Sequence, residues 1–206
     1  KTIVSHSAAF KNEAQYFAAA ISKSCGFSPV LKEGDSSGIQ VLQKAGFAKE
    51  AYSLQVLADK GIIIEASEPA GAFYALQTLL QSLPPEVICG KSYQGELQVP
   101  AMIVEDEPRF SWRSFMLDEA RNFKGMKEVK KLLDQMAQHK MNIFHWHLTD
   151  DQGWRIEIKK YPRLTSIGSK RKDTQTGGWK SKRRLGKPHE GFYTQKQIKE
   201  IVAYAA

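Results

Sequence analysis

Residues 145–154 read His-Trp-His-Leu-Thr-Asp-Asp-Gln-Gly-Trp and combine the pattern of a strand with a strongly polar end. Because side chains alternate between the two faces of a strand, His145 and His147 should share one face and the apolar residues beside them the other. The apolar face is suited to lie under a helix. Asp150 and Asp151 follow at the carboxyl end of this strand, where barrel enzymes place their working groups.

A repeated strand–helix pattern surrounds this stretch. Residues 113–118 and 142–148 have strand character, and amphipathic helices are predicted over 126–140 and 195–205. The two strands lie about 30 residues apart, the length of a βαβ unit with parallel strands and a right-handed crossover. A closed (β/α)8 barrel needs about 250 residues, so residues 110–206 supply at most two of its eight strands. The chain also ends inside a helix pattern, and we expect a truncated piece of a longer protein.

The first half has the pattern of a small α/β unit. Its expected elements are a strand end at 2–4, a helix over 10–21 capped by Gly26, a hairpin of 52–57 and 61–66, a helix from Pro69 that stops before Pro84, and a strand over 99–104. The predicted fold class is therefore α/β. A small α+β domain (1–105), with helices on one face of a sheet, precedes the first two βα units of a truncated (β/α)8 TIM barrel (106–206).

Composition excludes several protein classes. The 206 residues are 42% hydrophobic and 25% charged, which is ordinary for a globular protein and excludes collagen-like, disulfide-scaffold and wholly disordered chains. No apolar run approaches the ~20 residues that cross a bilayer, so we expect no membrane span. The net charge of +8 is compatible with a polyanionic partner but does not by itself indicate one. Cys25 and Cys89 are compatible with one bridge or with two buried thiols. Because the chain begins at Lys1 without an initiator Met, we expect a processed or recombinant piece that has lost any export signal.

Arg121 follows the first barrel strand on a loop and is a candidate ligand-binding residue. A guanidinium there can donate paired hydrogen bonds to vicinal hydroxyls or to a carboxylate, or it can cap local structure by pairing with Asp118. Asp118 and Glu119 face opposite ways as neighbours on a strand, so they cannot both act on one bond. A satisfied buried histidine or an Asp-Asp turn is also common in purely structural roles. Two His, two Asp and two Trp within residues 145–154 favour a functional site instead.

Several ordered segments resemble one enzyme family. They are 108–113, 116–118 with Arg121, 145–155, 161–164, and Tyr193-Thr194 with the helix that follows, and 71–79 is similar to a helix of the family's non-catalytic N-terminal domain. Together these segments resemble the β-N-acetylhexosaminidases of glycoside hydrolase family 20. The resemblance covers nearly the whole chain.

The resemblance implies removal of a terminal β-linked N-acetylhexosamine by substrate-assisted catalysis. The substrate's 2-acetamido carbonyl attacks the anomeric carbon and forms an oxazolinium ion, while a Glu protonates the leaving oxygen and the preceding Asp orients the acetamido group. Arg121 matches the arginine that holds the 3- and 4-hydroxyls of the sugar. One of Asp150 or Asp151, with Asp150 preferred, matches the aspartate that supports the acid through a later histidine. The remaining residues are implied to be supporting groups: Asp151, His147, His145 and Asp118.

The family's catalytic Asp-Glu pair belongs to a later strand, and neither residues 106–107 nor 118–119 have its context. We therefore expect no catalytic residue in this chain, an inactive isolated chain, and no metal or other cofactor. The implied partners are glycans ending in N-acetylglucosamine or N-acetylgalactosamine, and the rest of the barrel or another copy covering the open sheet. No nucleic acid is expected. Family membership implies a periplasmic or secreted location.

Three alternatives to this interpretation follow from the residues. The His145/His147 pair also resembles the start of the binuclear zinc site in metal-dependent amidohydrolase barrels. Basic runs at 170–172 and 180–184 can contact nucleic acid or an anionic glycan, or form a solvated loop on the rim of the substrate site. The chain can also be a carbohydrate-binding or scaffold domain that stacks sugars on tryptophans. Those tryptophans are Trp112, Trp146, Trp154 and Trp179, of which Trp112 and Trp146 lie in apolar strand patterns that predict core positions.

Overall fold

The computed structural model describes residues 2–34, 36–178 and 180–206. The chain forms two compact units, Lys1–Ser111 and Trp112–Ala206. Among the described residues, no helix is both long enough and apolar enough to cross a membrane. Cys25 and Cys89 are free thiols, the first half-buried and the second exposed, so the structure shows neither a bridge nor a fully buried pair.

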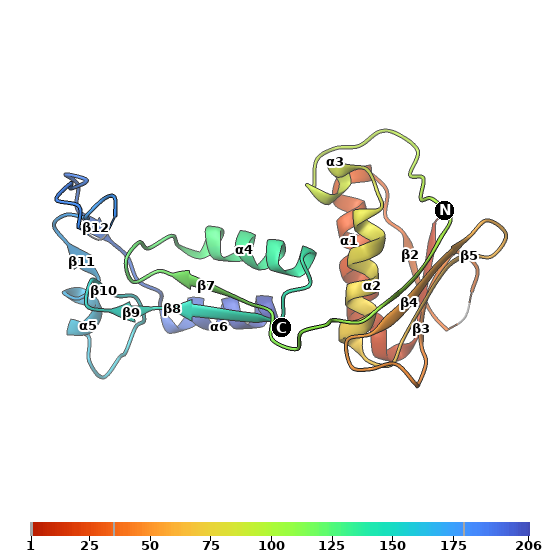
Figure 1. The fold of residues 1–206 in the computed structure, drawn as a ribbon, viewed down its shortest axis with the longest axis horizontal. Helices are drawn as coiled ribbons and strands as arrows, with labels where there is room; N and C mark the ends of the chain where they lie inside the picture. The colour runs from red at the N-terminus through yellow and green to blue at the C-terminus, as the bar shows by residue number, and fades with distance from the viewer. Residues whose placement is uncertain (1, 35, 179) are drawn as a thin grey trace. The chain divides into compact units, whose positions relative to one another are not determined.

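The first unit is built on a mixed six-stranded sheet (Figure 1). Its strands are β1 (Ile3–His6), β2 (Val30–Glu33), β3 (Ile39–Gln43), β4 (Tyr52–Leu57), β5 (Gly61–Ala66) and β6 (Met102–Asp106). They lie in the order β2-β1-β3-β5-β4-β6. The first four strands of that order pair in parallel, whereas β4 runs antiparallel to both β5 and β6. The β4–β5 hairpin is confirmed, and the last predicted strand begins three residues later than expected.

Helices cover one face of this sheet. A 3-10 turn (Ala8–Phe10) leads into α1 (Lys11–Cys25), and α2 (Pro69–Gln81) is followed by the short α3 (Pro85–Ile88). Figure 1 shows α1 and α2 side by side against the strands. Gly26 caps α1 with a φ of 68°, a left-handed conformation that glycine adopts without a Cβ clash. Pro69 occupies the first turn of α2, where its missing N–H costs no hydrogen bond. Both predicted helices are confirmed.

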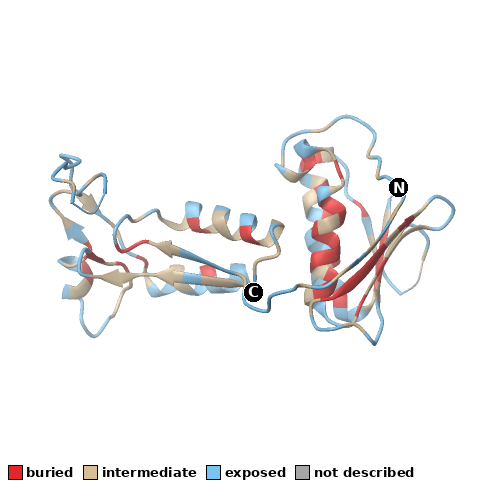
Figure 2. Cartoon of the chain, viewed as in Figure 1, coloured by how far each residue is buried: buried red, intermediate tan, exposed pale blue. Residues whose placement is uncertain are grey.

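The core of the first unit lies between these helices and the sheet. Figure 2 shows buried residues concentrated on α2 and on the strands. The large, fully buried apolar side chains include Phe10, Phe17, Leu54, Ile64, Leu76 and Leu79. Sequence analysis missed β2 and β3. The residues of β2 are mostly exposed and lack apolar alternation, whereas the Ile39–Gln43 segment carried an apolar pattern that could have identified β3.

The second unit contains two parallel strands and two long helices. They are β7 (Ser114–Asp118), α4 (Met126–Gln138), β8 (Ile143–His147) and α6 (Gln195–Ala205), as predicted to within a few residues. Short elements fill the connection between β8 and α6: β9 (Thr149–Asp150), β10 (Gly153–Trp154), α5 (Arg163–Ser166), β11 (Lys170–Arg171) and β12 (His189–Glu190). The helix α6 begins at a capping box, in which Thr194 and Gln197 exchange side-chain and backbone hydrogen bonds.

The two faces of β8 differ as the sequence predicted. Phe144 and Trp146 join an apolar cluster beneath α4 and α6, and the rings of Trp146 and Tyr193 lie 4.6 Å apart. The two histidines lie on the opposite face. Trp112 contradicts its predicted core position because it is 70% exposed. It precedes β7 and lies outside the apolar cluster, and its indole N–H donates to Ser114 Oγ at 3.0 Å.

Candidate active-site network

Four polar side chains meet at the carboxyl ends of β7 and β8. Asp118 ends β7 and pairs in register with His147, the last residue of β8. Arg121 Nη1 lies 3.0 Å from Asp118 Oδ2 and 2.8 Å from Asp150 Oδ2. His147 Nε2 lies 2.8 Å from the same Asp150 oxygen. The structure therefore brings four of the expected site residues into one hydrogen-bonded network.

The geometry around His147 fixes which group holds the proton. Its Nε2 lies 3.2 Å from Arg121 Nη1 as well as 2.8 Å from Asp150 Oδ2. A guanidinium can only donate and a carboxylate can only accept, so one ring nitrogen cannot hydrogen bond to both. Because Asp150 is ionised, Nε2–H donates to Asp150. Arg121 then acts on this carboxylate as the opposite charge of an ion pair.

The surroundings of Asp150 keep its carboxylate charged. The hydrogen bond from His147 is the largest influence, and the backbone N–H of Asp151 donates to Oδ1 at 2.9 Å. With the nearby Arg121 charge, these contacts lower the pKa of the Asp150 carboxyl below its usual value. Asp150 therefore serves as an acceptor and charge partner at neutral pH rather than as a proton donor.

Arg121 is both anchored and accessible. Its backbone N–H donates to Asp118 Oδ1 at 3.0 Å, and its side chain remains 48% exposed. Within the described parts of the chain, its guanidinium contacts all use Nη1. Its Nε and Nη2 groups can therefore donate to an incoming hydroxyl or carboxylate. The pairing with Asp118 and the capacity to bind a ligand, which were alternatives at the level of sequence, are compatible in the structure.

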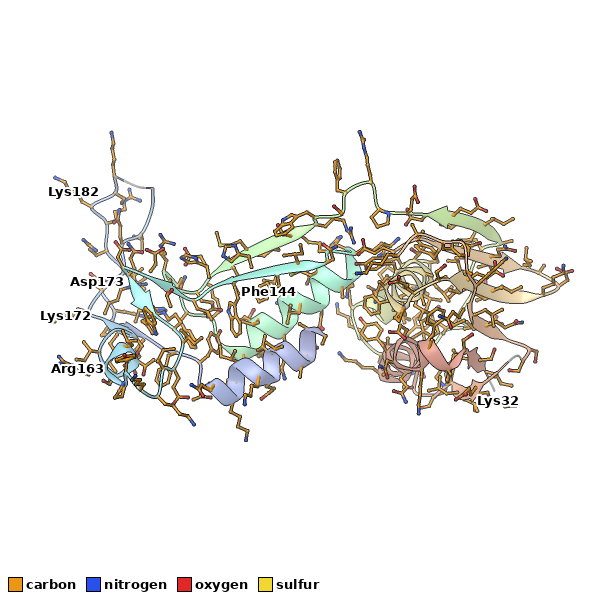
Figure 3. All side chains as sticks on the ribbon, turned by 90° about the horizontal axis from the view of Figure 1, so that it is seen from below. Lys32, Phe144, Arg163, Lys172, Asp173 and Lys182 are labelled. Carbon is orange, nitrogen blue, oxygen red and sulfur yellow. The ribbon has the colours of Figure 1, made fainter. Side chains whose placement is uncertain are left out.

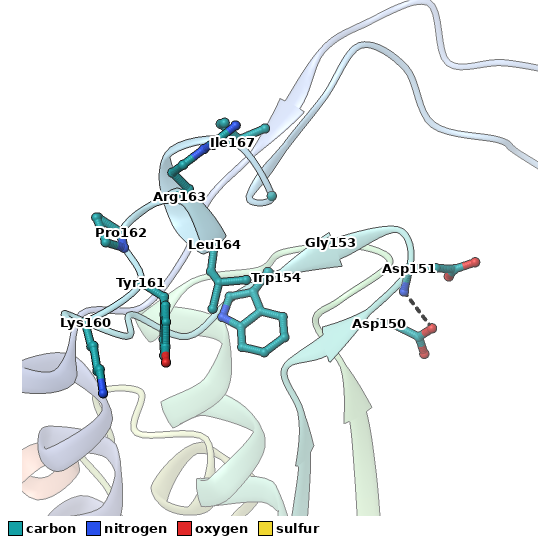
Figure 4. Close-up of a pocket in the computed structure, with 11 residues that line it drawn as sticks. Asp150, Asp151, Gly153, Trp154, Lys160, Tyr161, Pro162, Arg163, Leu164 and Ile167 are labelled. Atoms are coloured by element: carbon teal, nitrogen blue, oxygen red, sulfur yellow. Dashed lines mark hydrogen bonds between the residues drawn. The ribbon is translucent and has the colours of Figure 1, made fainter.

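His145 and Asp151 lie beside this network rather than in it. The rings of His145 and His147 are 6.1 Å apart on the same face of β8, and His145 is exposed. Asp151 contributes its backbone N–H to Asp150, and its side chain is exposed. Figure 4 shows the Asp151 carboxylate directed away from Tyr161. Of the two consecutive aspartates, only Asp150 pairs with Arg121 among the described residues.

Glu119 diverges from Asp118, as the alternation of a strand requires. Glu119 is fully buried, and its Oε2 accepts the backbone N–H of Lys124 at 2.7 Å. Burial raises the pKa of the Glu119 carboxyl, and burial also raises the pKa of the phenol of Tyr193 nearby. Asp118 instead contacts Arg121 on the accessible side. The predicted divergence of the two side chains is confirmed.

Arg155 is a structural centre of the site that sequence analysis missed. It is fully buried, and burial lowers the pKa of its guanidinium. The guanidinium donates to four backbone carbonyl oxygens, those of Glu119 (3.0 Å), Ala120 (3.0 Å), Ser169 (2.6 Å) and Gly191 (2.9 Å). These carbonyls come from three separate segments of the chain. Because Ala120 directly precedes Arg121, Arg155 holds the backbone from which Arg121 extends. The only sequence signal was an arginine between the apolar residues Trp154 and Ile156.

An open hollow of about 800 Å³ is lined by Asp150 and Asp151 and by residues of the segment 153–168. Figure 4 shows Trp154, Tyr161 and Leu164 along it. The Trp154 Nε1–H donates to the carbonyl of Ile156 at 2.7 Å, which fixes the indole beside the hollow. The side chain of Tyr161 is 57% exposed. Of the tryptophans considered as sugar-stacking residues, Trp179 lies outside the described residues.

The described residues contain no group of three or more His, Cys, Asp or Glu side chains arranged to hold a metal ion. Asp150 is the carboxylate nearest to His147 in the network, and its Oδ2 atom is already engaged by Arg121 and the ring. The expectation that the protein needs neither metal nor cofactor stays a prediction.

Two family models match the chain, one for each compact unit. Residues 1–107 match the model described as glycosyl hydrolase family 20, domain 2. Residues 110–206 match the model described as glycosyl hydrolase family 20, catalytic domain.

Curated relatives with these features are considerably longer than this chain. The β-hexosaminidase of Porphyromonas gingivalis is 48% identical over 159 residues, a match that covers 77% of this chain and 19% of that protein. The β-hexosaminidase of Vibrio furnissii is 46% identical over 164 residues, covering 76% of this chain and 24% of that protein. The chain therefore spans about a fifth to a quarter of these relatives.

Solved structures resemble the chain over nearly its whole length. The Streptomyces plicatus N-acetyl-β-hexosaminidase in complex with Thio-NAglucal has a TM-score of 0.80 and 35% identity, covering 98% of this chain and 39% of that one. The Vibrio harveyi exo-β-N-acetylglucosaminidase in complex with N-acetylglucosamine has a TM-score of 0.81 and 31% identity, covering 100% of this chain and 31% of that one.

Proposed function

The chain belongs to glycosyl hydrolase family 20, and we propose that it is part of a β-N-acetylhexosaminidase. The complete enzyme removes terminal β-linked N-acetylhexosamine from glycans. The observation that carries this proposal is the 2.8 Å ion pair between Arg121 and Asp150 at the carboxyl ends of two parallel strands. The names of the similar proteins, and the N-acetylglucosamine bound to one of them, support the same substrate class.

The second unit is proposed to begin a (β/α)8 barrel, with functional domains at residues 1–105 and 106–206. The parallel β7–β8 pair with its intervening α4 supports two βα units. Phe115 and Met116 on β7 are 41% and 52% exposed. The two residues lie on opposite faces of the strand, so apolar side chains on both faces of this sheet need cover. We propose that the rest of the barrel, or another copy, supplies this cover, and that the enzyme is exported.

In the proposed reaction Arg121 donates hydrogen bonds to the 3- and 4-hydroxyls of the terminal sugar. Asp150 supports the acid through a later histidine, while His147 and Asp118 hold Asp150 and Arg121 in place. The 2-acetamido carbonyl oxygen of the substrate attacks the anomeric carbon as the glycosidic bond breaks and the acid protonates the leaving oxygen. Water then opens the resulting oxazolinium ion, so no metal or cofactor is required. The acid Glu and its Asp partner lie beyond Ala206. The isolated chain is therefore inactive.

The proposal is tested with the full-length protein and the 206-residue chain on a chromogenic β-N-acetylglucosaminide. The full-length protein is expected to release the chromophore, and the short chain to remain at background. Arg121→Met is expected to lower kcat/KM by about 100-fold or more, because charge-assisted hydrogen bonds contribute about 1.5–3 kcal/mol each. Lys127→Met, at an exposed cation on α4 of the same unit, is the matched control. An inactive full-length protein, or an Arg121→Met variant as active as the control, contradicts the proposal.

A further inference from the structure

Most of the chain's excess positive charge lies in one loop, residues 170–187. This basic loop holds eight Lys or Arg residues against one Asp, a net charge of +7 beside the +8 of the whole chain. Besides Lys170, its exposed cations are Lys172, Lys180, Lys182, Arg183, Arg184 and Lys187. Among the described residues, the one ion pair of this loop is Lys170 with Glu190 at 3.9 Å. The exposed cations are therefore available to an external anion.

The basic loop is folded back on itself as a hairpin. The Leu185 N–H donates to Thr174 O at 2.8 Å, and the Thr176 N–H donates to Arg183 O at 3.0 Å. Asp173 Oδ1 closes the base by accepting the N–H of Gly186 at 2.8 Å. The single acid of the loop is thus used internally, and the hairpin concentrates its cations in one place.

Arg171 joins this hairpin to the proposed sugar site. Its guanidinium donates to the carbonyl oxygen of Arg121 and, at 3.1 Å, to that of Gln152. The base of the basic loop is therefore fixed to both segments that carry the Arg121–Asp150 pair. Figure 3 shows Lys172 and Lys182 projecting outward at the same end of this unit as Asp173. A charged group on a bound glycan is attracted by the loop wherever it comes within about 8–10 Å of these cations, the distance over which salt screens exposed charges.

We propose that the basic loop selects anionic glycans, in which a carboxylate or sulfate is carried by the sugar that follows the terminal N-acetylhexosamine. This inference rests on the proposed function, because the same hydrolase site supplies the bond that is cut. The loop attracts the acidic leaving-group sugar while Arg121 holds the neutral terminal sugar. Because the loop is tied directly to the backbone of Arg121, we favour a ligand that the sugar site also holds, and a nucleic acid is tested as the competing partner.

The test compares two disaccharides that differ only at C6 of the second sugar, which is a carboxylate in one compound and a hydroxymethyl group in the other. In both, N-acetylglucosamine is β-linked to a second sugar, which is glucuronate in one and glucose in the other. At low salt the full-length protein is expected to show a kcat/KM at least about tenfold higher for the glucuronate compound, since a steering field raises association by 10-fold or more. This preference is expected to fall toward unity as salt is raised.

Two variants, each lacking four positive charges, distinguish an effect of the basic loop on substrate preference from an effect of the protein's overall charge. Replacing Lys180, Lys182, Arg183 and Arg184 by Gln is expected to abolish the preference for glucuronate. Replacing Lys11, Lys32, Lys49 and Lys60 by Gln, all exposed lysines of the first unit, is expected to keep the preference. A loop variant that retains the preference, or that loses kcat/KM equally on both substrates, overturns the inference.

Other outcomes distinguish this inference from the proposed function. If the full-length protein cleaves both disaccharides at equal rates at low salt, the hydrolase assignment stands and the inference fails. If it cleaves neither, both fail. If a random DNA oligonucleotide binds through the loop more tightly than a hyaluronate oligosaccharide of equal charge, the partner is nucleic acid and the inference fails.

Discussion

Replacing Arg155 by Met tests whether one buried cation organises the candidate site. The substitution keeps an apolar stem of similar reach and removes all four hydrogen bonds to the carbonyls of three segments. Each such bond from a charged donor contributes about 1.5–3 kcal/mol, but the four share one group and are not additive. The desolvation of the guanidinium offsets part of the gain. Removing one partner of a buried charged network typically costs about 3–5 kcal/mol, and we expect a loss of that size.

Tryptophan fluorescence reports on this loss directly. All four tryptophans of the 206-residue chain lie at or after residue 112. Urea unfolding of this chain, followed by fluorescence, therefore monitors the second unit alone. Arg155→Lys keeps the charge but not the planar fork of donors, and we expect it to recover less than half of the loss. Arg163→Met is the control, with an expected change within about 0.5 kcal/mol because Arg163 is exposed.

A loss below about 1 kcal/mol for Arg155→Met, at an unchanged denaturant slope, refutes this reasoning. It would show that water replaces the guanidinium at the four carbonyls with little penalty. A loss equal to that of Arg163→Met would likewise remove Arg155 from any role in holding the Arg121 backbone.

Three further predictions concern neighbouring groups. A Cβ at Gly153 would lie 2.5 Å from Arg155 Nη2, so Gly153→Ala is expected to lower the free energy of unfolding by about 1–3 kcal/mol in the same assay. Gly178→Ala is the control and should leave this free energy unchanged, because no atom lies within 4 Å of a Cβ built there. Asp150 has a lowered pKa in the folded chain, so its ionised form stabilises the fold above the unfolded-state pKa of about 3.9, and this contribution is lost as pH falls through the folded-state value. The stability difference between the parent and Asp150→Asn should therefore shrink below about pH 4, and a difference constant from pH 6 to 2 would contradict the ion pair. The full-length protein should keep its activity in EDTA and contain substoichiometric zinc, whereas stoichiometric zinc would favour a metal site at His145 and His147.

Much of the local structure could be predicted because it depends on residues close in sequence. Alternation placed Phe144 and Trp146 under the helices and His147 on the other face, and the same rule separated Asp118 from Glu119. Gly26 and Pro69 marked helix ends through their own backbone preferences. The second unit's strand–helix order followed from apolar spacing alone. These features need no information about distant parts of the chain.

The tertiary structure alone decided which distant groups meet. Arg121 and Asp150 are 29 positions apart in the sequence, and only the parallel register of β7 and β8 brings them to 2.8 Å. The structural role of Arg155 could not be predicted because its partners are backbone carbonyls. Every residue has one, so the sequence does not indicate which of them a buried arginine will bind. The predicted core position of Trp112 was wrong because an apolar residue is buried only where another layer of the fold covers it. Local pattern therefore identified the long helices, most of the longer strands and the two faces of β8, whereas long-range packing selected the contacts between them.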